Sequence, residues 1–366
     1  MPSLTLPAMA VLIHSDGSDL HADAVRWGLD RIGHPTIFWP AGRFPADQAL
    51  SARLGPGGET FSLGLAGETI DLAGVATVWN RRRGRPAMSP TLDARDLGFA
   101  TEQSRQHLDA FLSTACPGAL WVNGIHAARM EVNKIHQLRL ARQAGFAVPA
   151  TLFSNAPDEI RSFFNAHRGN VVYKTYKLGV WAEKAAGGGK LSVNYTSAVT
   201  AASLADSAAL AIAPGIFQER IAKAFEVRTT IMGESSFSAR IEAGDGADAA
   251  VDWRALPRDR LRLRPFAVPP EIREKCLGYM RSAGLRFASF DFIVTPDGEF
   301  CFLEVNQMGQ FLWKEEKLPE LPLLDAMCAF LAAGDPEFRY EPGRERLRLA
   351  DYYRSERFAG LSRPDA

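Results

Sequence analysis

Hydrophobic and polar positions alternate along the first third of the chain with two different periods. Compact apolar runs at 9–15 and 35–39 predict strands, and 19–33 between them has the spacing of an amphipathic helix. A further strand is predicted over 74–83 and a helix over 98–115. An opening of strand, helix and strand is typical of a small α/β layer domain.

The middle of the chain continues this alternation of helices and strands. The predicted elements are a helix from 133 to Gly145, a strand beyond Pro149, a helix over 156–169, a strand over 171–176 and a hairpin over 180–200 whose tip is Gly187-Gly188-Gly189. The last third is richer in strands. It predicts a strand over 215–221, a hairpin over 225–241, a second hairpin that begins at Asp291, a helix over 321–334 and then a polar, Arg-rich tail with no predicted element.

The composition is that of an ordinary soluble globular protein, with 46% apolar and 23% charged residues over 366 positions, a length that suits two or three subdomains. Lys+Arg and Asp+Glu are equal at 42 each, so no overall charge attracts nucleic acid or an anionic membrane. Basic runs at 80–86 and 258–265 indicate a solvated face or a small anion site rather than a nucleic-acid surface. The four cysteines lack metal-site spacing. Since no signal peptide or transmembrane run is present, we expect a cytoplasmic protein.

The hairpin that begins at Asp291 brings two carboxylates together. Pro296-Asp297-Gly298 is a turn motif, and a two-residue loop of Asp297 and Gly298 places Asp291 directly opposite Glu304. Like charges that face each other across a ladder are destabilising, which raises the question of what compensates them. A three-residue turn would break this register.

Alternation predicts that Asp291 and Ile293 share a face with Phe302, Glu304 and Asn306 of the partner strand. Two carboxylates and an amide oxygen suit Mg²⁺, which is held by such groups together with waters and substrate phosphates. On spacing alone, a solvated sheet face or a proton shared by the two carboxyl groups stays open.

Three basic residues extend this picture. Glu226 and Arg228 share one face of their strand, and Arg240 and Glu242 share one face of the returning strand. Two strand-borne arginines near a metal would clamp phosphate oxygens. Lys174 lies in the apolar run VVYKTY and would be costly to bury without an anionic partner.

Two glycine-rich segments do not match nucleotide-binding motifs. GDGADA at 244–249 does not follow the first strand of a β-α-β unit, which excludes a dinucleotide fingerprint. GGGKL at 187–191 lacks the upstream glycine and the Ser/Thr of a Walker A loop. This segment is either a glycine flap over phosphates or a plain hairpin tip.

The chain resembles the ATP-grasp superfamily, and within it the microviridin-type ATP-grasp maturases of ribosomally made peptides. The resemblance is carried by NKIHQLRLARQAGFAVPATL, VVYKTY, FQERIAKAFEVRTTIMG, FSARI, DWR and DFIVTPDGEFCFLEVNQMGQFLW, and it covers nearly the whole chain, VWNRRR included. It implies an α+β (α/β) ATP-grasp fold. The implied parts are an N-terminal pre-ATP-grasp α/β domain (8–128), a central subdomain (129–214), a C-terminal antiparallel-sheet subdomain that binds ATP and Mg²⁺ (215–335) and a polar tail (336–366).

The resemblance also implies roles for single residues. These are Lys134 and Lys174 on the ATP phosphates, Gln218, Glu219 and Ile221 as the adenine hinge, Glu226 on the ribose hydroxyls, Arg228 and Arg240 on the phosphates and the acyl phosphate, and Asp291, Glu304 and Asn306 as magnesium ligands. The family usually has Pro after the metal-binding Asn, whereas this chain has Gln307. The departure leaves the metal ligands in place and puts the loop shape near the acceptor in doubt.

The expected partner is a precursor peptide with a leader and a core. By resemblance the hairpin over 180–200 engages the leader, and its Trp181, Tyr195 and Val199 are suited to an interface. A purely structural hairpin is the alternative. The segment Asp252-Trp253-Arg254 is a further substrate-binding candidate, and a homodimer is expected.

The implied activity is carboxylate activation. ATP would phosphorylate an Asp or Glu side chain of the peptide, and a hydroxyl or amine would attack the acyl phosphate to give an ω-ester or ω-amide ring. Two alternatives are a ligase that joins a free amino acid to a protein or small molecule, and a non-catalytic nucleotide-binding regulator. The complete set of metal ligands and lysines argues against the regulator.

Overall fold

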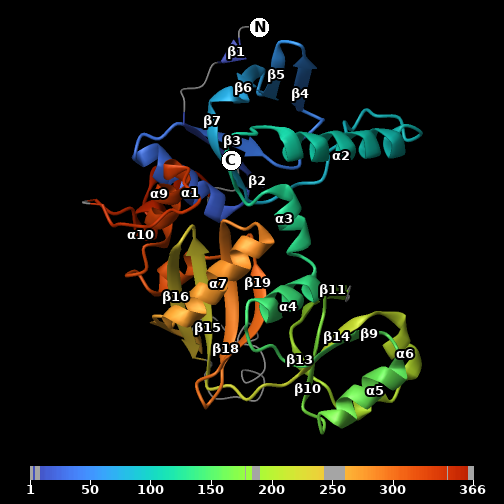
Figure 1. Cartoon of the computed structure of the whole chain (residues 1–366). Helices are drawn as coiled ribbons and strands as arrows, with labels where there is room; N and C mark the ends of the chain where they lie inside the picture. The colour runs from blue at the N-terminus through green and yellow to red at the C-terminus, as the bar shows by residue number, and fades with distance from the viewer. Residues whose placement is uncertain are drawn as a thin grey trace.

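The computed structural model describes residues 3–4, 9–177, 179–183, 190–242, 260–343 and 345–361. The N-terminal region lies at one end of the molecule, an antiparallel sheet of C-terminal strands lies in the middle, and a small central region lies at the other end (Figure 1). Among the described residues, no helix combines the length and the apolar character needed to span a bilayer. The mixed α+β architecture is the one that the sequence predicts.

The N-terminal region is built on a parallel sheet, as predicted. In spatial order its strands are β3 (Thr36–Pro40), β2 (Ala10–Ser15), β7 (Val75–Asn80) and β8 (Leu120–Val122), with helices α1 (Leu20–Arg31), α2 (Leu97–Thr114) and α3 (Ile125–Met130) beside it. Every residue of β2 is buried, as expected for an inner strand of a parallel sheet. The carboxylate of Asp19 caps α1 by accepting hydrogen bonds from the backbone N–H groups of His21 and Ala22.

A second, small sheet extends this region, and the sequence predicts none of its strands. Its members in spatial order are β1 (Ser3–Leu4), β6 (Glu68–Asp71), β5 (Gly58–Leu65) and β4 (Gln48–Gly55). In the chain, β6 is followed by a 3₁₀ turn at Leu72–Gly74. Most positions of β4 are exposed. A strand with little buried surface shows no alternation of apolar and polar residues, so the sequence pattern does not predict it as a strand.

The central region has a four-stranded antiparallel sheet and a core of its own. Its elements are strands β13 (Ser197–Ala198), β10 (Val171–Lys174), β14 (Gly215–Glu219) and β9 (Thr151–Ser154) in spatial order, helices α5 (Pro157–Ala166) and α6 (Ser207–Ile212), and a 3₁₀ turn at Ala202–Leu204. Helix α4 (Lys134–Gln143) precedes these elements in the chain and packs on the C-terminal region, where Ala141 is part of the core. The buried side chains of Ile160, Val171, Leu204 and Phe217 form the small core under this sheet.

The predicted hairpin beyond Lys174 is confirmed as a separate pair of strands. β11 (Gly179–Glu183) and β12 (Lys190–Asn194) are antiparallel and form a two-stranded sheet. Within the described chain this sheet has no hydrogen-bonded strand from another sheet. Its predicted tip, Gly187-Gly188-Gly189, lies outside the described residues.

The C-terminal sheet is antiparallel throughout, and its two hairpins are those that the sequence predicts. Its strands in spatial order are β17 (Arg262–Pro265), β16 (Ser235–Glu242), β15 (Phe225–Met232), β18 (Phe287–Val294) and β19 (Phe300–Asn306). Helix α7 (Pro270–Ala283) covers one face, where the ring of Tyr279 packs on Phe290 and Phe302. The opposite face carries charged side chains.

The polar tail is folded, although its sequence predicts no element. It follows α8 (Leu312–Lys317) and α9 (Leu323–Ala333) and forms two short helices, α10 (Leu349–Tyr353) and α11 (Glu356–Leu361). The hydroxyl of Tyr352 donates to Asp23 of α1 at 2.8 Å, and the guanidinium of Arg357 pairs with the same carboxylate at 2.6 Å. These contacts are with distant residues, so a local pattern could not reveal them.

A single buried asparagine joins the N-terminal region to the C-terminal sheet. The amide nitrogen of Asn123 donates to the carbonyl oxygens of Phe287 (2.8 Å) and Gln307 (2.9 Å). Its amide oxygen accepts from the backbone N–H groups of Arg286 (2.7 Å) and Phe287 (3.0 Å). The side chain therefore holds the start of β18 and the loop after β19 at once.

Candidate active site

The predicted opposition of the two carboxylates is confirmed, although the turn is not the predicted one. Asp291 of β18 lies directly opposite Glu304 of β19. The loop has three residues, since Val294 pairs with Phe300 and the backbone N–H of Thr295 donates to the carbonyl oxygen of Glu299 at 3.0 Å. The longer turn shifts the register by one residue near the loop, and a shift between Asp291 and Phe292 restores it.

The residue that restores the register is Leu303, which has no partner opposite it. Phe292 pairs with Phe302 and Asp291 with Glu304, so Leu303 is the extra residue of a β-bulge. The bulge also corrects one prediction. Phe302 does not share the face of Glu304 but points to the α7 side, where it is fully buried.

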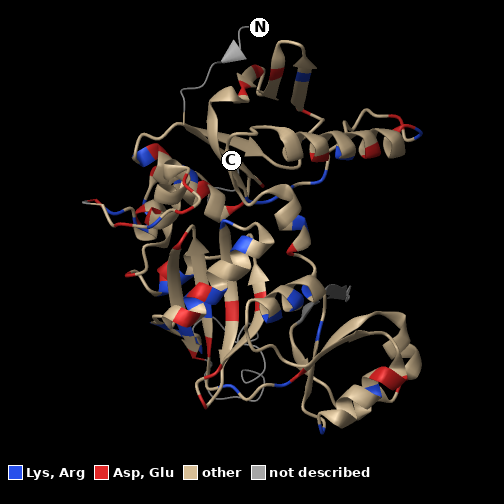
Figure 2. Ribbon diagram, viewed as in Figure 1, with Lys and Arg blue, Asp and Glu red and all other residues tan. Residues whose placement is uncertain are grey.

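On the charged face, each of the two carboxylates has a cation beside it. Asp291 lies opposite Arg228 of β15, whose Nη1 donates to its two oxygens at 2.6 and 2.8 Å. Glu304 pairs with Lys134 of α4, Nζ to Oε2, at 2.7 Å. Figure 2 shows the acidic positions of β18 and β19 near the basic positions of α4. These ion pairs remove the like-charge conflict that the sequence raises.

The donor set of this face fits a hard divalent cation. Asp291 and Glu304 supply carboxylate oxygens, and Asn306 follows Glu304 by two residues on the same strand. The side-chain oxygen of Asn306 accepts from the backbone N–H of Met308 at 3.1 Å, which orients the amide. No group of three His, Cys, Asp or Glu side chains with metal-site geometry occurs in the described part of the chain. A magnesium ion here would depend on the amide oxygen and on phosphate oxygens of the substrate.

A small pocket lies on the side of Glu304 that faces the central sheet. It has a volume of about 200 Å³, and its walls include Lys134, Lys174, Tyr195, Gln218 and Glu304. Nζ of Lys174 donates to the side-chain oxygen of Gln218 at 2.6 Å, and the amide nitrogen of Gln218 donates to Thr151 Oγ1 at 2.9 Å. The structure thus brings both predicted phosphate lysines and one predicted hinge residue to one cavity.

The other predicted nucleotide residues lie on the chain between β14 and the start of β15. Glu219 and Ile221 are half-buried. An oxygen of Glu219 accepts from the backbone N–H of Ala150 at 3.4 Å. Glu226 is buried and pairs with Lys223 at 2.7 Å. Their roles in adenine and ribose binding stay predictions.

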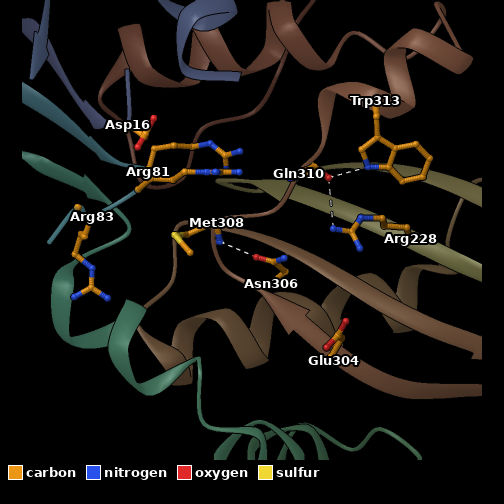
Figure 3. A pocket seen from close by; sticks show the side chains of 11 residues that line it. Asp16, Arg81, Arg83, Arg228, Glu304, Asn306, Met308, Gln310 and Trp313 are labelled. Carbon is orange, nitrogen blue, oxygen red and sulfur yellow. Dashed lines mark hydrogen bonds between the residues drawn. The ribbon is translucent and has the colours of Figure 1, made fainter. Parts of the chain in front are cut away.

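A larger pocket, of about 610 Å³, lies on the other side of Glu304. Its lining residues come from the N-terminal region and from β15, β19, the loop after β19 and α8, and include Asp16, Arg81, Arg228, Glu304, Asn306 and Trp313. Figure 3 shows Arg81 extending into this pocket from the N-terminal side, with Arg228 and Glu304 across from it. Arg228 also donates to the carbonyl oxygen of Gln310 at 3.4 Å. Both pockets share Glu304 as a wall.

One predicted arginine does not face these pockets. Arg240 lies opposite Val227, whereas Arg228 lies opposite Ala239, so the two arginines are on opposite faces of the sheet. The guanidinium of Arg240 lies 3.9 Å from the ring centre of Phe225 and pairs with Glu242 at 3.0 Å. The expectation that Arg228 and Arg240 form one clamp is therefore wrong. The alternation of side chains within each strand was predicted correctly. The register between the two strands decides which residues share a face of the sheet, and the sequence does not give this register.

The predicted peptide contacts have mixed outcomes. Val199 is buried in the core of the central region with Val171, so it is not available to a peptide. Tyr195 lines the small pocket beside Lys174 rather than the outer face of the hairpin. Trp181 belongs to β11, but its side chain lies outside the described part of the structure. The segment Asp252-Trp253-Arg254 also lies outside the described residues.

Two basic features near the site were not among the predicted site residues. The run of Arg81, Arg82 and Arg83 lines the larger pocket, which agrees with the second of its two predicted uses, a solvated face or a small anion site. Lys314 of α8 is fully buried, and its Nζ donates to Thr230 Oγ1 at 2.8 Å and to the carbonyl oxygen of Phe237 at 3.0 Å. Burial lowers the pKa of Lys314 well below 10.5. The arginine run was visible in the sequence, whereas nothing marked Lys314.

Three solved structures are similar to this chain over most of its length. Macrocyclase MdnC of Microcystis aeruginosa MRC, solved with its precursor peptide MdnA, is 27% identical, with a TM-score of 0.76 and coverage of 89% of this chain and 100% of that one. A RiPP-associated ATP-grasp ligase of Chryseobacterium gregarium, solved with ADP and a leader and core peptide, is 26% identical, with a TM-score of 0.78 and coverage of 91% and 99%. Macrocyclase MdnB of Microcystis aeruginosa MRC is 28% identical, with a TM-score of 0.70 and coverage of 89% and 99%.

No protein-family model and no curated protein sequence matches the chain. The likeness is therefore carried by the three-dimensional structure, at 26–28% identity and nearly full coverage of each solved chain. The predicted metal-binding hairpin and the pockets on its two sides lie within this fold. The chain therefore has the fold of these ATP-grasp ligases and macrocyclases, which were solved as enzymes of ribosomally made peptides.

Proposed function

We propose that this protein uses ATP to activate a side-chain carboxylate of a ribosomally made peptide and couples it to a hydroxyl or amine of the same peptide. The γ-phosphoryl group of ATP is transferred to a carboxylate oxygen, which gives an acyl phosphate and ADP. The hydroxyl oxygen or amine nitrogen then bonds to the carbonyl carbon, loses its proton, and inorganic phosphate leaves. The product is an ω-ester or ω-amide ring, and no nucleophile of the protein is required.

The observation that carries the proposal is the position of Glu304 between two pockets of different character. The smaller pocket contains Lys134, Lys174 and Gln218, groups that suit a nucleotide. The larger pocket is rich in arginine and suits a substrate that carries carboxylates. Phosphoryl transfer would then take place where the two pockets meet.

The lysines of the smaller pocket are already placed for triphosphate oxygens. Lys134 pairs with Glu304, and Lys174 is held by Gln218. Because both ammonium groups are fixed by contacts within the protein, they would meet the phosphates without large rearrangement. Such pre-organised charge stabilises the transferring phosphoryl group more than mobile water does.

Magnesium fits the charged face of β18 and β19. Asp291, Glu304 and Asn306 would hold it together with phosphate oxygens. When bound, the ion neutralises charge on the phosphates and on the transferring group. Arg228 lies beside Asp291 and lines the larger pocket, so we assign it the phosphoryl oxygens and the acyl phosphate.

The two-stranded sheet β11–β12 is our candidate site for the leader of the peptide. In the described chain its strands pair with each other and with no other sheet, so their outer edges can add a peptide strand. Hydrogen exchange of this segment, measured with and without the peptide, tests the assignment. Unchanged exchange despite measurable peptide binding would place recognition elsewhere. We also expect a homodimer, which sedimentation analysis would test.

The test of the function uses purified protein, ATP, Mg²⁺ and synthetic copies of the short Asp/Glu- and Ser/Thr/Lys-rich peptides encoded beside its gene. We expect release of ADP and phosphate and a peptide that has lost one water molecule for each ring formed. A peptide that gains the mass of an added amino acid would instead identify a ligase for free amino acids. ATP that stays intact with every peptide would contradict the proposal.

A further inference from the structure

A wall of three consecutive arginines follows β7 and borders the larger pocket opposite Glu304. Its members are Arg81, Arg82 and Arg83, and we name it the arginine wall. Arg81 is 1% exposed and extends into the pocket (Figure 3). Its Nη1 donates to the carbonyl oxygen of Gly309 at 3.2 Å, which ties the wall to the loop after β19.

The guanidinium of Arg81 is not fully satisfied by the protein. Its Nε lies 3.2 Å from Asp19 Oδ2 without the geometry of a hydrogen bond, and its Nη2 has no hydrogen-bond partner among the described residues. Burial lowers the pKa of Arg81 to about 10, so the group stays charged at neutral pH. A buried cation with unsatisfied donors is costly, and a nearby anion compensates that cost.

The wall has more positive charge than its neighbours balance. The single carboxylate of Asp19 serves both Arg81 and Arg82, the latter at 2.8 Å. Arg83 has no ion pair within the described residues; its pKa is lowered, chiefly by burial, then by the charge of Arg129, while Asp109 acts in the opposite direction. Asp16 also lines the pocket, where Ser18 donates to its carboxylate and the charge of Arg82 acts on it, so two carboxylates face three guanidinium groups.

The histidines next to the arginine wall add no charge to it. His14 and His21 are buried, and burial is the largest cause that lowers their pKa values to about 4 and about 3. Both rings are therefore neutral at physiological pH. The excess charge of the wall comes from guanidinium groups alone, which bind carboxylates with two parallel hydrogen bonds.

We propose that the arginine wall binds a second carboxylate of the peptide, one that is not being activated, and so selects core sequences rich in Asp and Glu. The inference rests on the proposed function for the identity of the substrate as a peptide. A carboxylate fits better than the nucleotide phosphates because the wall lies across the larger pocket from Glu304, whereas Lys174 and Gln218 lie in the other pocket. One acidic side chain would be held at the wall while another reacts beside Arg228.

The experiment measures binding of two fluorescein-labelled probes, a hexaglutamate and a hexaglutamine peptide, by anisotropy. The test variant is Arg82→Gln with Arg83→Gln. Arg81 is kept because its burial makes it important for folding. The matched control is Arg85→Gln, an exposed arginine of the same segment that does not line the pocket.

We expect the wild type to bind hexaglutamate more tightly than hexaglutamine, and the double variant to lose about tenfold in affinity for hexaglutamate alone. Arg85→Gln should behave as wild type, and the affinity for ATP with Mg²⁺ should stay the same in all three proteins. Equal binding of both probes by the wild type, or unchanged hexaglutamate binding by the double variant, would overturn the proposal. An equal loss of ATP affinity would do so too, because the wall would then hold nucleotide phosphates.

These outcomes are separate from those that test the function. Ring formation by a protein without preference for hexaglutamate would refute the arginine wall and keep the proposed function. Loss of hexaglutamate binding in the double variant, in a protein that consumes no ATP with any peptide, would refute the function and keep an anion site for acidic chains.

Discussion

Two charged surfaces face each other across the larger pocket, and they differ in how completely their charged groups are paired within the protein. On the face of β18 and β19, Asp291 is paired with Arg228 and Glu304 with Lys134. On the arginine wall, Asp19 serves two guanidinium groups and Arg83 has no ion pair among the described residues. The first surface is balanced before any ligand arrives, so a ligand must exchange partners with it. The second surface, in the described part of the chain, has three guanidinium groups and only two carboxylates, Asp16 and Asp19, so a ligand can supply the missing negative charge.

The largest expected effect comes from the balanced surface. Glu304→Gln removes a carboxylate that faces both pockets and should lower ATP turnover with the peptide by at least about a hundredfold, because a magnesium ligand is lost. Circular dichroism and thermal unfolding should stay close to wild type. Glu299→Gln, on the exposed loop of the same hairpin, is the control and should keep full turnover. Wild-type turnover by Glu304→Gln would exclude Glu304 as a ligand.

Arg228→Met tests whether the ion pair with Asp291 stabilises the folded protein. It leaves the buried carboxylate of Asp291 without its nearest cation, which should cost about 3 kcal/mol in the free energy of unfolding, measured by urea denaturation without nucleotide. Adding Asp291→Asn to Arg228→Met should recover much of this loss, because no unpaired charge is then buried. If Arg228→Met is as stable as wild type, Arg228 does not compensate the buried charge of Asp291.

Lys174→Met tests the nucleotide side. Removing the ammonium should weaken ATP binding by about 2 kcal/mol, roughly thirtyfold, measured by calorimetry with Mg²⁺. Lys177→Met, an exposed lysine three positions along, is the matched control and should bind ATP as wild type does. Equal affinities for both variants would remove Lys174 from the phosphate site.

The smallest expected effect concerns Lys314, whose ammonium is fully buried. Its pKa is lowered by burial well below 10.5, so below pH 10.5 the unfolded chain binds more protons at this position than the folded chain does. The contribution of Lys314 to the free energy of unfolding should therefore rise with pH toward 10.5, and the difference in that free energy between wild type and Lys314→Met should change with pH accordingly. Lys317→Met, exposed on the same helix, should show no such pH-dependent difference from wild type. Parallel curves for all three proteins would show that Lys314 stays charged.

Hydrophobic periodicity was enough to predict three of the four strands of the parallel N-terminal sheet, the helix over 133–145 and both hairpins of the C-terminal sheet, because these elements have buried faces; it did not predict β8. It did not predict β4, which is mostly exposed, or the helices α10 and α11, whose contacts are with α1 far away in the sequence. Elements without a buried face of their own are held by tertiary contacts that no local pattern contains.

The candidate site shows the same division. The opposition of Asp291 and Glu304 was predicted, but it exists because the bulge at Leu303 compensates a longer turn, and an apolar residue in a strand gives no sign of a bulge. Arg240 was misplaced because face matching between strands depends on register, which alternation within a strand does not fix. Val199 looked like an interface residue and is a core residue, since branched apolar side chains serve both uses.

The side chain of Asn123 has a mechanical consequence. Its hydrogen bonds hold the start of β18 and the loop after β19 against the N-terminal region, so two walls of the larger pocket are tied to each other. The central sheet has a separate core and lines the smaller pocket, the proposed nucleotide site. We expect ADP to leave and ATP to enter by a hinge motion of the central sheet against these two walls. A peptide with some of its rings formed could then stay bound in the larger pocket while ADP is exchanged for ATP, which would make ring formation processive.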